Sequence, residues 1–246
     1  MSEDMTREDV QAAYRSIQMV TDRIISLAVN ACSRPDMIRA ATQIGLRPAK
    51  GLPAHEDEET TAMMSDVALF EPNQRGRIAF NTFCQDSGAR LSLSERALAV
   101  RMADSRFSLF SGAEIHPVAG VWLEDVLDAD RRLWLMDETL ETSLVPGTVM
   151  GMRLFDAGPF HVGHGVVTFP DEETIHMSVA SQERRGRQPF RHSLAARLYG
   201  DRARELTPFD PKDEWIVKLL VASLKSGLPI PGAPKGPGAP TKKTRR

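Results

Sequence analysis

The first hundred residues have the hydrophobic spacing of helices. From Val10 to Leu27, apolar side chains recur every three or four residues, which places them on one face of an amphipathic helix. Ser92-Leu93-Ser94-Glu95 has the spacing of a capping box and predicts the start of another helix. The sequence therefore predicts a helical region over residues 1–104. Its predicted helical segments are 10–27, 37–44, 63–70, 78–83 and 92–102.

At residue 105, alternation with a period of two replaces the helical spacing. Short apolar stretches are now separated by turn residues such as Pro146-Gly147, a pattern typical of β-strands. Five strands with short connections indicate a small antiparallel barrel or a strongly bent sheet over residues 105–170. The predicted strands are 106–115, 120–127, 131–137, 148–155 and 160–169.

Helical patterns return after Pro170 and define a second helical region over residues 171–227. The predicted helices there are 171–182, 190–203 and 213–224. Residues 228–246 are rich in proline and glycine and contain five cations and no acid. We expect a disordered basic tail, because a segment this poor in apolar residues cannot bury a core. The predicted fold class is α+β, with helices on both sides of one β-rich block.

Composition excludes several classes of protein. The chain has 246 residues, of which 41% are apolar and 26% charged, as in ordinary globular domains. Cys32 and Cys84 form no zinc motif or disulfide framework. No apolar run is long enough to cross a membrane, and the acidic N-terminus lacks the pattern of a secretory signal. We therefore expect a cytoplasmic protein with no cofactor and no membrane partner.

The net charge of −2 is the sum of oppositely charged segments. Residues 114–141 hold eight acids and two arginines, whereas residues 181–204 hold seven arginines and two acids. Because guanidinium groups match phosphate oxygens, the arginine segment and the tail predict contact with nucleic acid. The alternative is an intramolecular contact with the acidic strands. The candidate phosphate contacts are Arg184, Arg185, Arg187, Arg191, Lys242 and Lys243.

The histidines are the candidates for chemistry. His161 and His164 have the spacing of two metal ligands on a helix, and with His116 they could form a histidine-dependent hydrolase. Gly163 and Gly165 favour a strand instead, in which residues three apart point to opposite faces. Binding of one metal by both histidines would then need a bulge. The alternative is one core histidine and one that faces solvent.

Arg106-Phe107-Ser108-Leu109-Phe110 resembles the short peptide with which bacterial polymerases and repair proteins engage the replication sliding clamp, roughly Gln-Leu-Ser/Asp-Leu-Phe. Phe107 takes the apolar second place, and Leu109-Phe110 the pair that fills the pocket of the clamp. Arg106 stands where the family has glutamine. The resemblance implies a partner-binding peptide, which must be exposed to dock. The alternative is a buried barrel strand.

The strand block is also similar to that of uncharacterised bacterial proteins that often carry an SEC-C zinc motif. The similar segments are 107–110, 120–127, 146–150 and 152–154. The SEC-C cysteines do not occur here, so no metal role carries over. The resemblance implies a small barrel used for interaction.

Together these features predict a non-enzymatic regulatory or inhibitory binding protein that acts on a nucleic-acid-associated machine. Its most specific form is a protein that inhibits DNA replication by occupying the sliding clamp. A metal- or histidine-dependent hydrolase and a plain protein-interaction module are the alternatives. A pocket in which histidines and acids converge would favour the hydrolase, and an exposed Phe107–Phe110 segment would favour docking to a partner.

Overall fold

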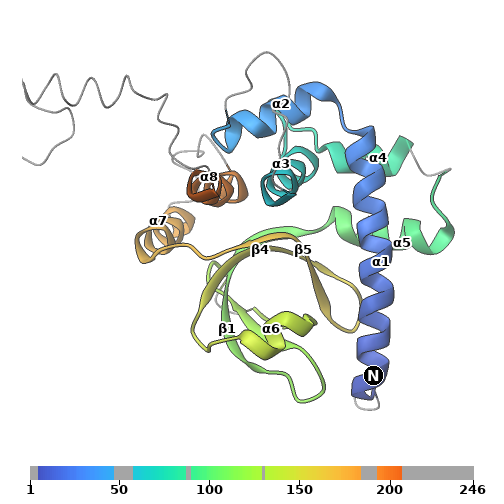
Figure 1. Cartoon of the computed structure of the whole chain (residues 1–246), viewed down its shortest axis with the longest axis vertical. Helices are drawn as coiled ribbons and strands as arrows, with labels where there is room; N and C mark the ends of the chain where they lie inside the picture. The colour runs from blue at the N-terminus through green and yellow to red at the C-terminus, as the bar shows by residue number, and fades with distance from the viewer. Residues whose placement is uncertain (1–4, 47–57, 87–89, 129–130, 184–192, 207–246) are drawn as a thin grey trace, which may run out of the picture. The chain divides into compact units, whose positions relative to one another are not determined.

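The computed structural model describes residues 5–46, 58–86, 90–128, 131–183 and 193–206, and confirms the α+β class. Residues Met1–Leu206 group into one compact unit by their contacts. In chain order the described elements are α1 (Arg7–Ala31), α2 (Arg34–Gln43), α3 (Glu58–Phe70), α4 (Ala79–Asp86), α5 (Leu93–Ala103), β1 (Arg106–Ile115), β2 (Val121–Asp125), β3 (Arg132–Leu135), α6 (Glu138–Ser143), β4 (Val149–Asp156), β5 (His161–Thr168), α7 (Glu172–Glu183) and α8 (Leu194–Leu206) (Figure 1).

Local signals set the starts of the N-terminal helices. Thr6 forms a capping box with Asp9 before α1, and Ser92 forms the predicted box with Glu95 before α5. Pro35 lies in the first turn of α2, where a proline leaves no helical hydrogen bond unmade. The predicted helices of residues 1–104 are confirmed, with ends that differ by a few residues.

The five strands close into a barrel in the order β1-β2-β3-β5-β4. The prediction of an antiparallel barrel is wrong for one pair, because β3 and β5 run parallel. Five strands cannot alternate in direction all the way round a closed ring, so one neighbouring pair must be parallel. The result is a five-stranded Greek-key barrel, the architecture that OB-folds use.

The short helix α6, between β3 and β4, was not predicted. Its six residues are too few to show a helical period. The side chain of Asp137 caps its start by accepting hydrogen bonds from the backbone N–H groups of Thr139 and Leu140. The positions of all five strands, and of α7 and α8, agree with the predictions to within a few residues.

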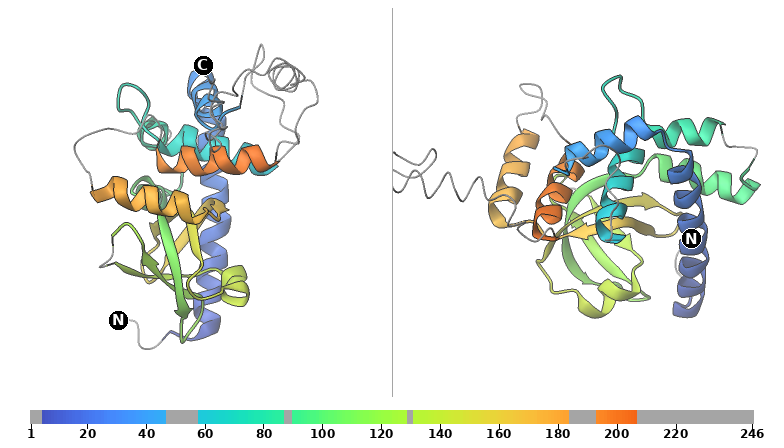
Figure 2. Two further views of the ribbon diagram at one scale, coloured as in Figure 1. Left: turned by 90° about the vertical axis from the view of Figure 1, so that its left-hand side faces the viewer. Right: turned by 45° about the horizontal axis from the view of Figure 1, so that its top comes forward.

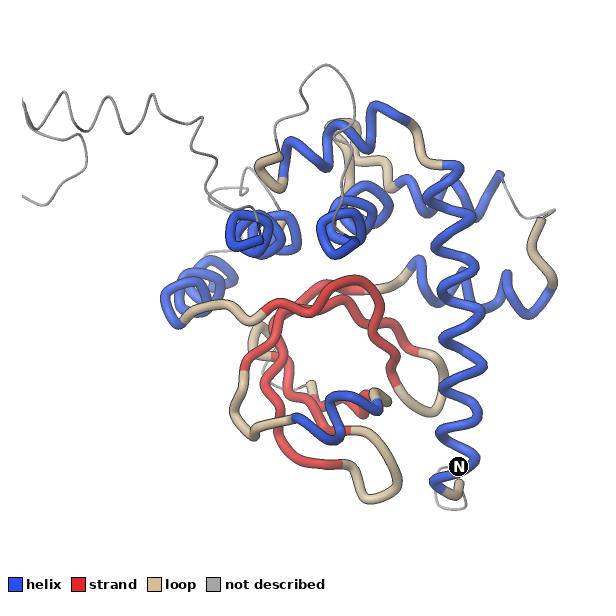
Figure 3. The backbone as a smooth tube through the Cα atoms, viewed as in Figure 1, coloured by secondary structure: helices blue, strands red, loops and turns tan. Residues whose placement is uncertain are grey.

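Helices cover part of the ring of strands (Figure 3). Val10 and Tyr14 of α1 share a hydrophobic cluster with Trp134 of β3 and with Phe160, so α1 packs directly on the barrel (Figure 2). A second cluster lies between α2, α3 and α8 and includes Tyr199. A third fills the barrel interior, and its members are Phe110, Val121, Leu123, Leu133, Leu135, Met150, Met152 and Leu154.

Two of the predicted segments, the helix at 213–224 and the tail at 228–246, lie outside the described residues. Within the described ranges, no helix combines the length and the apolar character needed to cross a membrane.

Candidate functional site

Arg153 is a buried cation on β4, and it joins the barrel to α3. Its side chain is 3% exposed. Its Nε donates to Asp66 Oδ1 at 2.8 Å and its Nη2 to Oδ2 at 3.1 Å, while Nη2 also donates to Glu71 Oε1 at 2.7 Å. Burial alone would lower the pKa of Arg153, but the two carboxylates raise it above its usual value. This bidentate pair fixes the Asp66 carboxylate in one orientation.

His164, on β5, lies beside this ion cluster with its side chain 6% exposed. Its Nδ1 is 3.9 Å from Asp66 Oδ1, too far for a hydrogen bond, but the carboxylate still favours a proton on Nδ1. Burial and then the charge of Arg153 lower the pKa of His164 to about 3, so the imidazole is neutral at neutral pH. Nε2 is then an acceptor, and no donor among the described residues reaches it.

Gly165 allows β5 to approach the helices closely at this point. Its φ of +81° lies in the left-handed region that favours glycine. A Cβ atom here would lie 3.3 Å from Asp66 Oδ1 and 3.2 Å from the hydroxyl of Tyr199. Tyr199 is fully buried and donates to the carbonyl of Val166 at 3.3 Å. The glycine therefore lets the strand that carries His164 lie against α3 and α8.

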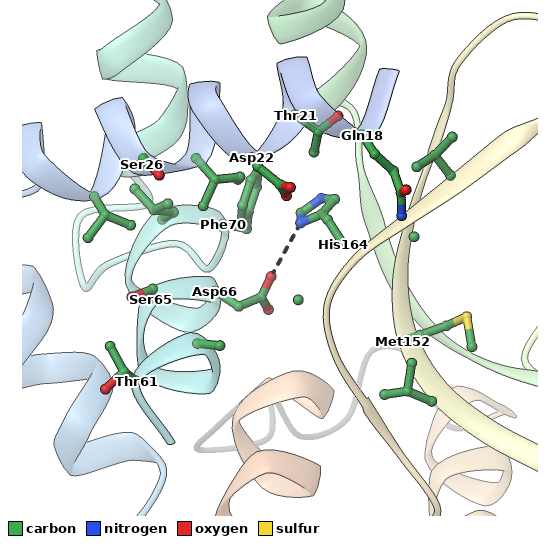
Figure 4. Close-up of a pocket in the computed structure, with 18 of the residues that line it drawn as sticks. Gln18, Thr21, Asp22, Ser26, Thr61, Ser65, Asp66, Phe70, Met152 and His164 are labelled. Carbon is green, nitrogen blue, oxygen red and sulfur yellow. Dashed lines mark ion pairs between the residues drawn. The ribbon is translucent and has the colours of Figure 1, made fainter. Parts of the chain in front are cut away.

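A cavity of about 750 Å³ lies between α1, α3 and β5. Asp66 and His164 belong to its wall, and α1 contributes Gln18, Thr21 and Asp22. Figure 4 shows the imidazole between the Asp66 carboxylate and these residues of α1. The hydroxyl of Thr21 is buried and, like Nε2 of His164, finds no hydrogen-bond partner within the part of the chain that the structure describes.

This cavity is the candidate functional site. Buried polar groups of native proteins are nearly always hydrogen-bonded, so two such atoms without partners in one cavity require an explanation. The volume lies within the range of about 300–1,000 Å³ that is typical of small-molecule sites. A bound molecule that reaches both atoms would satisfy them.

His161 and His116 lie away from this cavity. His161 lines a separate cavity of about 340 Å³ at one end of the barrel. His116 stacks on Trp134, with ring centroids 3.9 Å apart and planes at 8°. The predicted metal pair, His161 and His164, is thus not brought together, because residues three apart in a strand point to opposite sides. Among the described residues, no group of three or more histidine, cysteine, aspartate and glutamate side chains could hold a metal ion.

The segment Arg106–Phe110, which resembles the clamp-binding peptide, forms the first half of β1. This strand pairs with β2 on one side and with β4 on the other. Ser108, Leu109 and Phe110 are buried, Leu109 completely, and Arg106 is exposed. The segment is therefore the buried barrel strand of the alternative interpretation, and the exposure that a docking peptide needs is not met.

The predicted phosphate contacts Arg184, Arg185, Arg187, Arg191, Lys242 and Lys243 lie outside the described residues, so contact with nucleic acid stays a prediction. Three later arginines, Arg197, Arg202 and Arg204, lie within the described residues, and the last two form intramolecular ion pairs. Arg202 bonds to Glu59 and Glu205, and Arg204 bonds to Asp201.

Sequence reasoning missed Asp66 and Arg153, although each had a visible signal. Asp66 is the one charge in the apolar run 63–70, and Arg153 is the one charge between Val149 and Phe155. A lone charge in a buried helix or strand requires a partner. The sequence does not show that the two charges are each other's partner, because 87 positions separate them.

The fold and the site define an α+β protein with a helix-covered barrel and a ligand-sized cavity. The chain belongs to a family of unknown function, DUF7986, whose family model matches residues 8–190. The match spans α1, α3 and β5, and so includes the walls of the cavity. Comparison with curated proteins and with solved structures finds no match.

Proposed function

We propose that the protein is a non-enzymatic binding protein that receives a small molecule in the cavity between α1, α3 and β5. One observation carries the proposal: two residues of the cavity wall, His164 and Thr21, each hold a buried polar atom, Nε2 and Oγ1, without a partner among the described residues. An unsatisfied buried polar group costs about 1–3 kcal/mol. A ligand that bonds to both atoms removes this cost when it binds.

The geometry favours binding over the histidine-dependent hydrolase. A general base works best when its pKa is near the working pH, whereas the pKa of His164 is about 3. In a catalytic triad the carboxylate orients the histidine through a hydrogen bond. Here Asp66 bonds to Arg153 instead and lies 3.9 Å from the ring.

We also propose a regulatory role for the protein. We do not propose the sliding clamp as its partner, because Leu109 and Phe110, which would fill the pocket of the clamp, are buried in β1. The location that we infer is cytoplasmic. Cys32 and Cys84 are free, and burial raises the pKa of both thiols, to about 11 for Cys32. Cysteines that form no disulfide fit a reducing compartment.

The test is native mass spectrometry of the full chain purified from the cells that produce it. We expect a bound small molecule in the wild-type protein. Replacement of the cavity-lining Ala62 by tryptophan (Ala62→Trp) should exclude it, because the indole occupies the space of the ligand. The control is Ala12→Trp, at an exposed position of α1 outside the cavity wall.

The Thr21→Val variant guards against misfolding of Ala62→Trp, since it keeps the volume of the side chain and removes only the hydroxyl. It should retain less ligand than the wild type and still unfold cooperatively. The proposal is contradicted if the wild-type protein carries no ligand and a small-molecule extract of the same cells leaves its melting temperature unchanged.

A further inference from the structure

We infer that the ligand carries a protonated amine or guanidine group on an apolar body, an inference that rests on the proposed function of the cavity. The charge of the cavity wall is the first observation. Its formally charged residues are all acidic, and no lysine or arginine within the described ranges lines it. They are Asp22, Glu58, Asp66 and Asp137.

Little of this negative charge is neutralised within the protein. Arg153 faces two carboxylates, Asp66 and Glu71, so that cluster keeps a net charge of about −1 at neutral pH. Asp22 and Glu58 form no ion pair with any described residue. Such a surface attracts cations and repels anions.

The negative charge of nearby acids also acts on Tyr14, which lies in the same wall. Its pKa is raised, first by burial and then by the charges of Asp137, Glu138 and Asp22. The phenol is therefore neutral, and its oxygen accepts a hydrogen bond from Gln18 Nε2 at 2.6 Å. The O–H of Tyr14 remains a donor, so a ligand at this position meets this one donor beside the negative charge of the acids.

The two unpartnered atoms have matching chemistry. Neutral His164 offers an acceptor at Nε2, and the hydroxyl of Thr21 can accept as well. A protonated amine has several donors and no acceptor, so its chemistry matches both atoms and the acidic wall. A carboxylate would present acceptors to an acceptor and would be repelled by Asp22.

The apolar part of the proposed ligand is inferred from the remaining residues of the cavity wall. Between the polar groups, aliphatic and aromatic side chains from α1, α3 and β5 face the cavity, among them Ile25, Val29, Leu69, Phe70 and Val162. Burial of hydrocarbon against these side chains contributes about 25 cal/mol for each Å² removed from water. A ligand with an ammonium group and a hydrocarbon chain matches both parts of the wall.

The test is isothermal titration calorimetry of the full chain at low salt with linear diamines of increasing length. Each diamine is compared with the diol and the dicarboxylate of the same length. We expect at least one diamine to bind, with the diol and the dicarboxylate at least about tenfold weaker. Added salt should weaken the binding, because it screens the acidic wall.

Two variants locate the interaction. Asp22→Asn should weaken diamine binding about tenfold, because it removes a charge from the wall. Glu8→Gln removes an exposed charge of the same helix outside the wall and should leave the affinity unchanged.

The inference is overturned if diols or dicarboxylates bind as tightly as diamines, or if no diamine binds. It is also overturned if Asp22→Asn and Ala62→Trp leave diamine binding unchanged, since the diamine would then bind elsewhere on the surface. These results leave the proposed function intact as long as mass spectrometry finds a ligand that Ala62→Trp excludes. The proposed function fails on that separate experiment.

Discussion

At the scale of single residues, the fixed position of the site depends on the contact between Arg153 and Asp66. A buried ion pair adds little net stability compared with apolar residues of the same shape, but removal of one partner leaves an uncompensated buried charge. Replacement of one partner alone should therefore lower the free energy of unfolding more than replacement of both partners by apolar residues.

We predict that Arg153→Met lowers the free energy of unfolding by about 3–5 kcal/mol. The double variant Arg153→Met/Asp66→Leu should recover part of this loss, because it removes the buried carboxylate as well. Urea unfolding followed by circular dichroism measures both values. A double variant less stable than the single one would show that Asp66 is held by other groups.

A second prediction at this scale concerns His164 and the dependence of the free energy of unfolding on pH. Its pKa is about 3 in the folded chain and about 6.5 when unfolded, so the unfolded state binds more protons between these values. The contribution of neutral His164 to the free energy of unfolding is then fully present above pH 6.5 and is lost as the pH falls. Between pH 6.5 and 5, the free energy of unfolding should fall by about 2 kcal/mol less in His164→Gln than in the wild type. Urea unfolding at each pH measures this difference.

The control for this prediction is His176→Gln, on the exposed face of α7, which should leave the wild-type slope unchanged. His116 and His161 also have lowered pKa values, but both are present in the wild type and in the variants, so the difference isolates His164. Equal slopes for the wild type and His164→Gln would mean that the imidazole is hydrated in the folded protein.

At the scale of elements, alternation and capping signals located most of the secondary structure. The period-two pattern from residue 106 and the Ser92–Glu95 box each depend on neighbouring residues, which a sequence displays directly. The parallel pairing of β3 with β5 depends on barrel closure, a property of the whole ring. The contact of Asp66 with Arg153 likewise depends on how α3 packs on β4, and no local pattern encodes it.

The strand β1 allows a test of the peptide that resembles the clamp-binding motif. Leu109→Ala should lower the free energy of unfolding by about 2–5 kcal/mol, because the side chain of Leu109 on β1 is completely buried. Arg106→Gln, which restores the glutamine of the clamp-binding family at an exposed position, should cost less than about 0.5 kcal/mol. Thermal and chemical denaturation of the two variants measure the contrast.

Clamp binding should be undetectable for both the wild type and Arg106→Gln, since both residues of the pocket-filling pair stay buried. A stable Leu109→Ala variant, or clamp binding by Arg106→Gln, would mean that the first half of β1 detaches from its neighbours.

At the scale of the whole molecule, the hydrophobic clusters join the helices to the barrel. The cluster that contains Val10 and Tyr14 of α1 also contains Trp134 and Phe160 of the barrel. The boundary between helices and strands along the sequence is therefore not a boundary between separate cores. Residues up to Leu206 should consequently unfold as one cooperative unit.

We predict that helix loss and barrel opening occur at the same temperature. Far-ultraviolet circular dichroism reports mainly on the helices, and the fluorescence of Trp122 and Trp134 reports on the barrel. A Trp215→Phe background removes the third tryptophan, which lies outside the described residues. Coincident transitions are expected. A fluorescence transition several degrees away from the helical one would mean that α1 separates from the barrel before the barrel opens.

The parallel joint between β3 and β5 also has a mechanical consequence. The structure places a single residue pair there, Leu135 with His161, whereas β1 and β4 pair along six residues. The cluster that holds α1 includes Met136, which follows β3 directly, and Val162 of β5. A backbone hydrogen bond from the N–H of Met136 to the carbonyl of His161, at 3.0 Å, joins the strands here, and the packing of α1 reinforces it. A force that pulls α1 away from the barrel should therefore open the ring between β3 and β5 before any other strand pair separates.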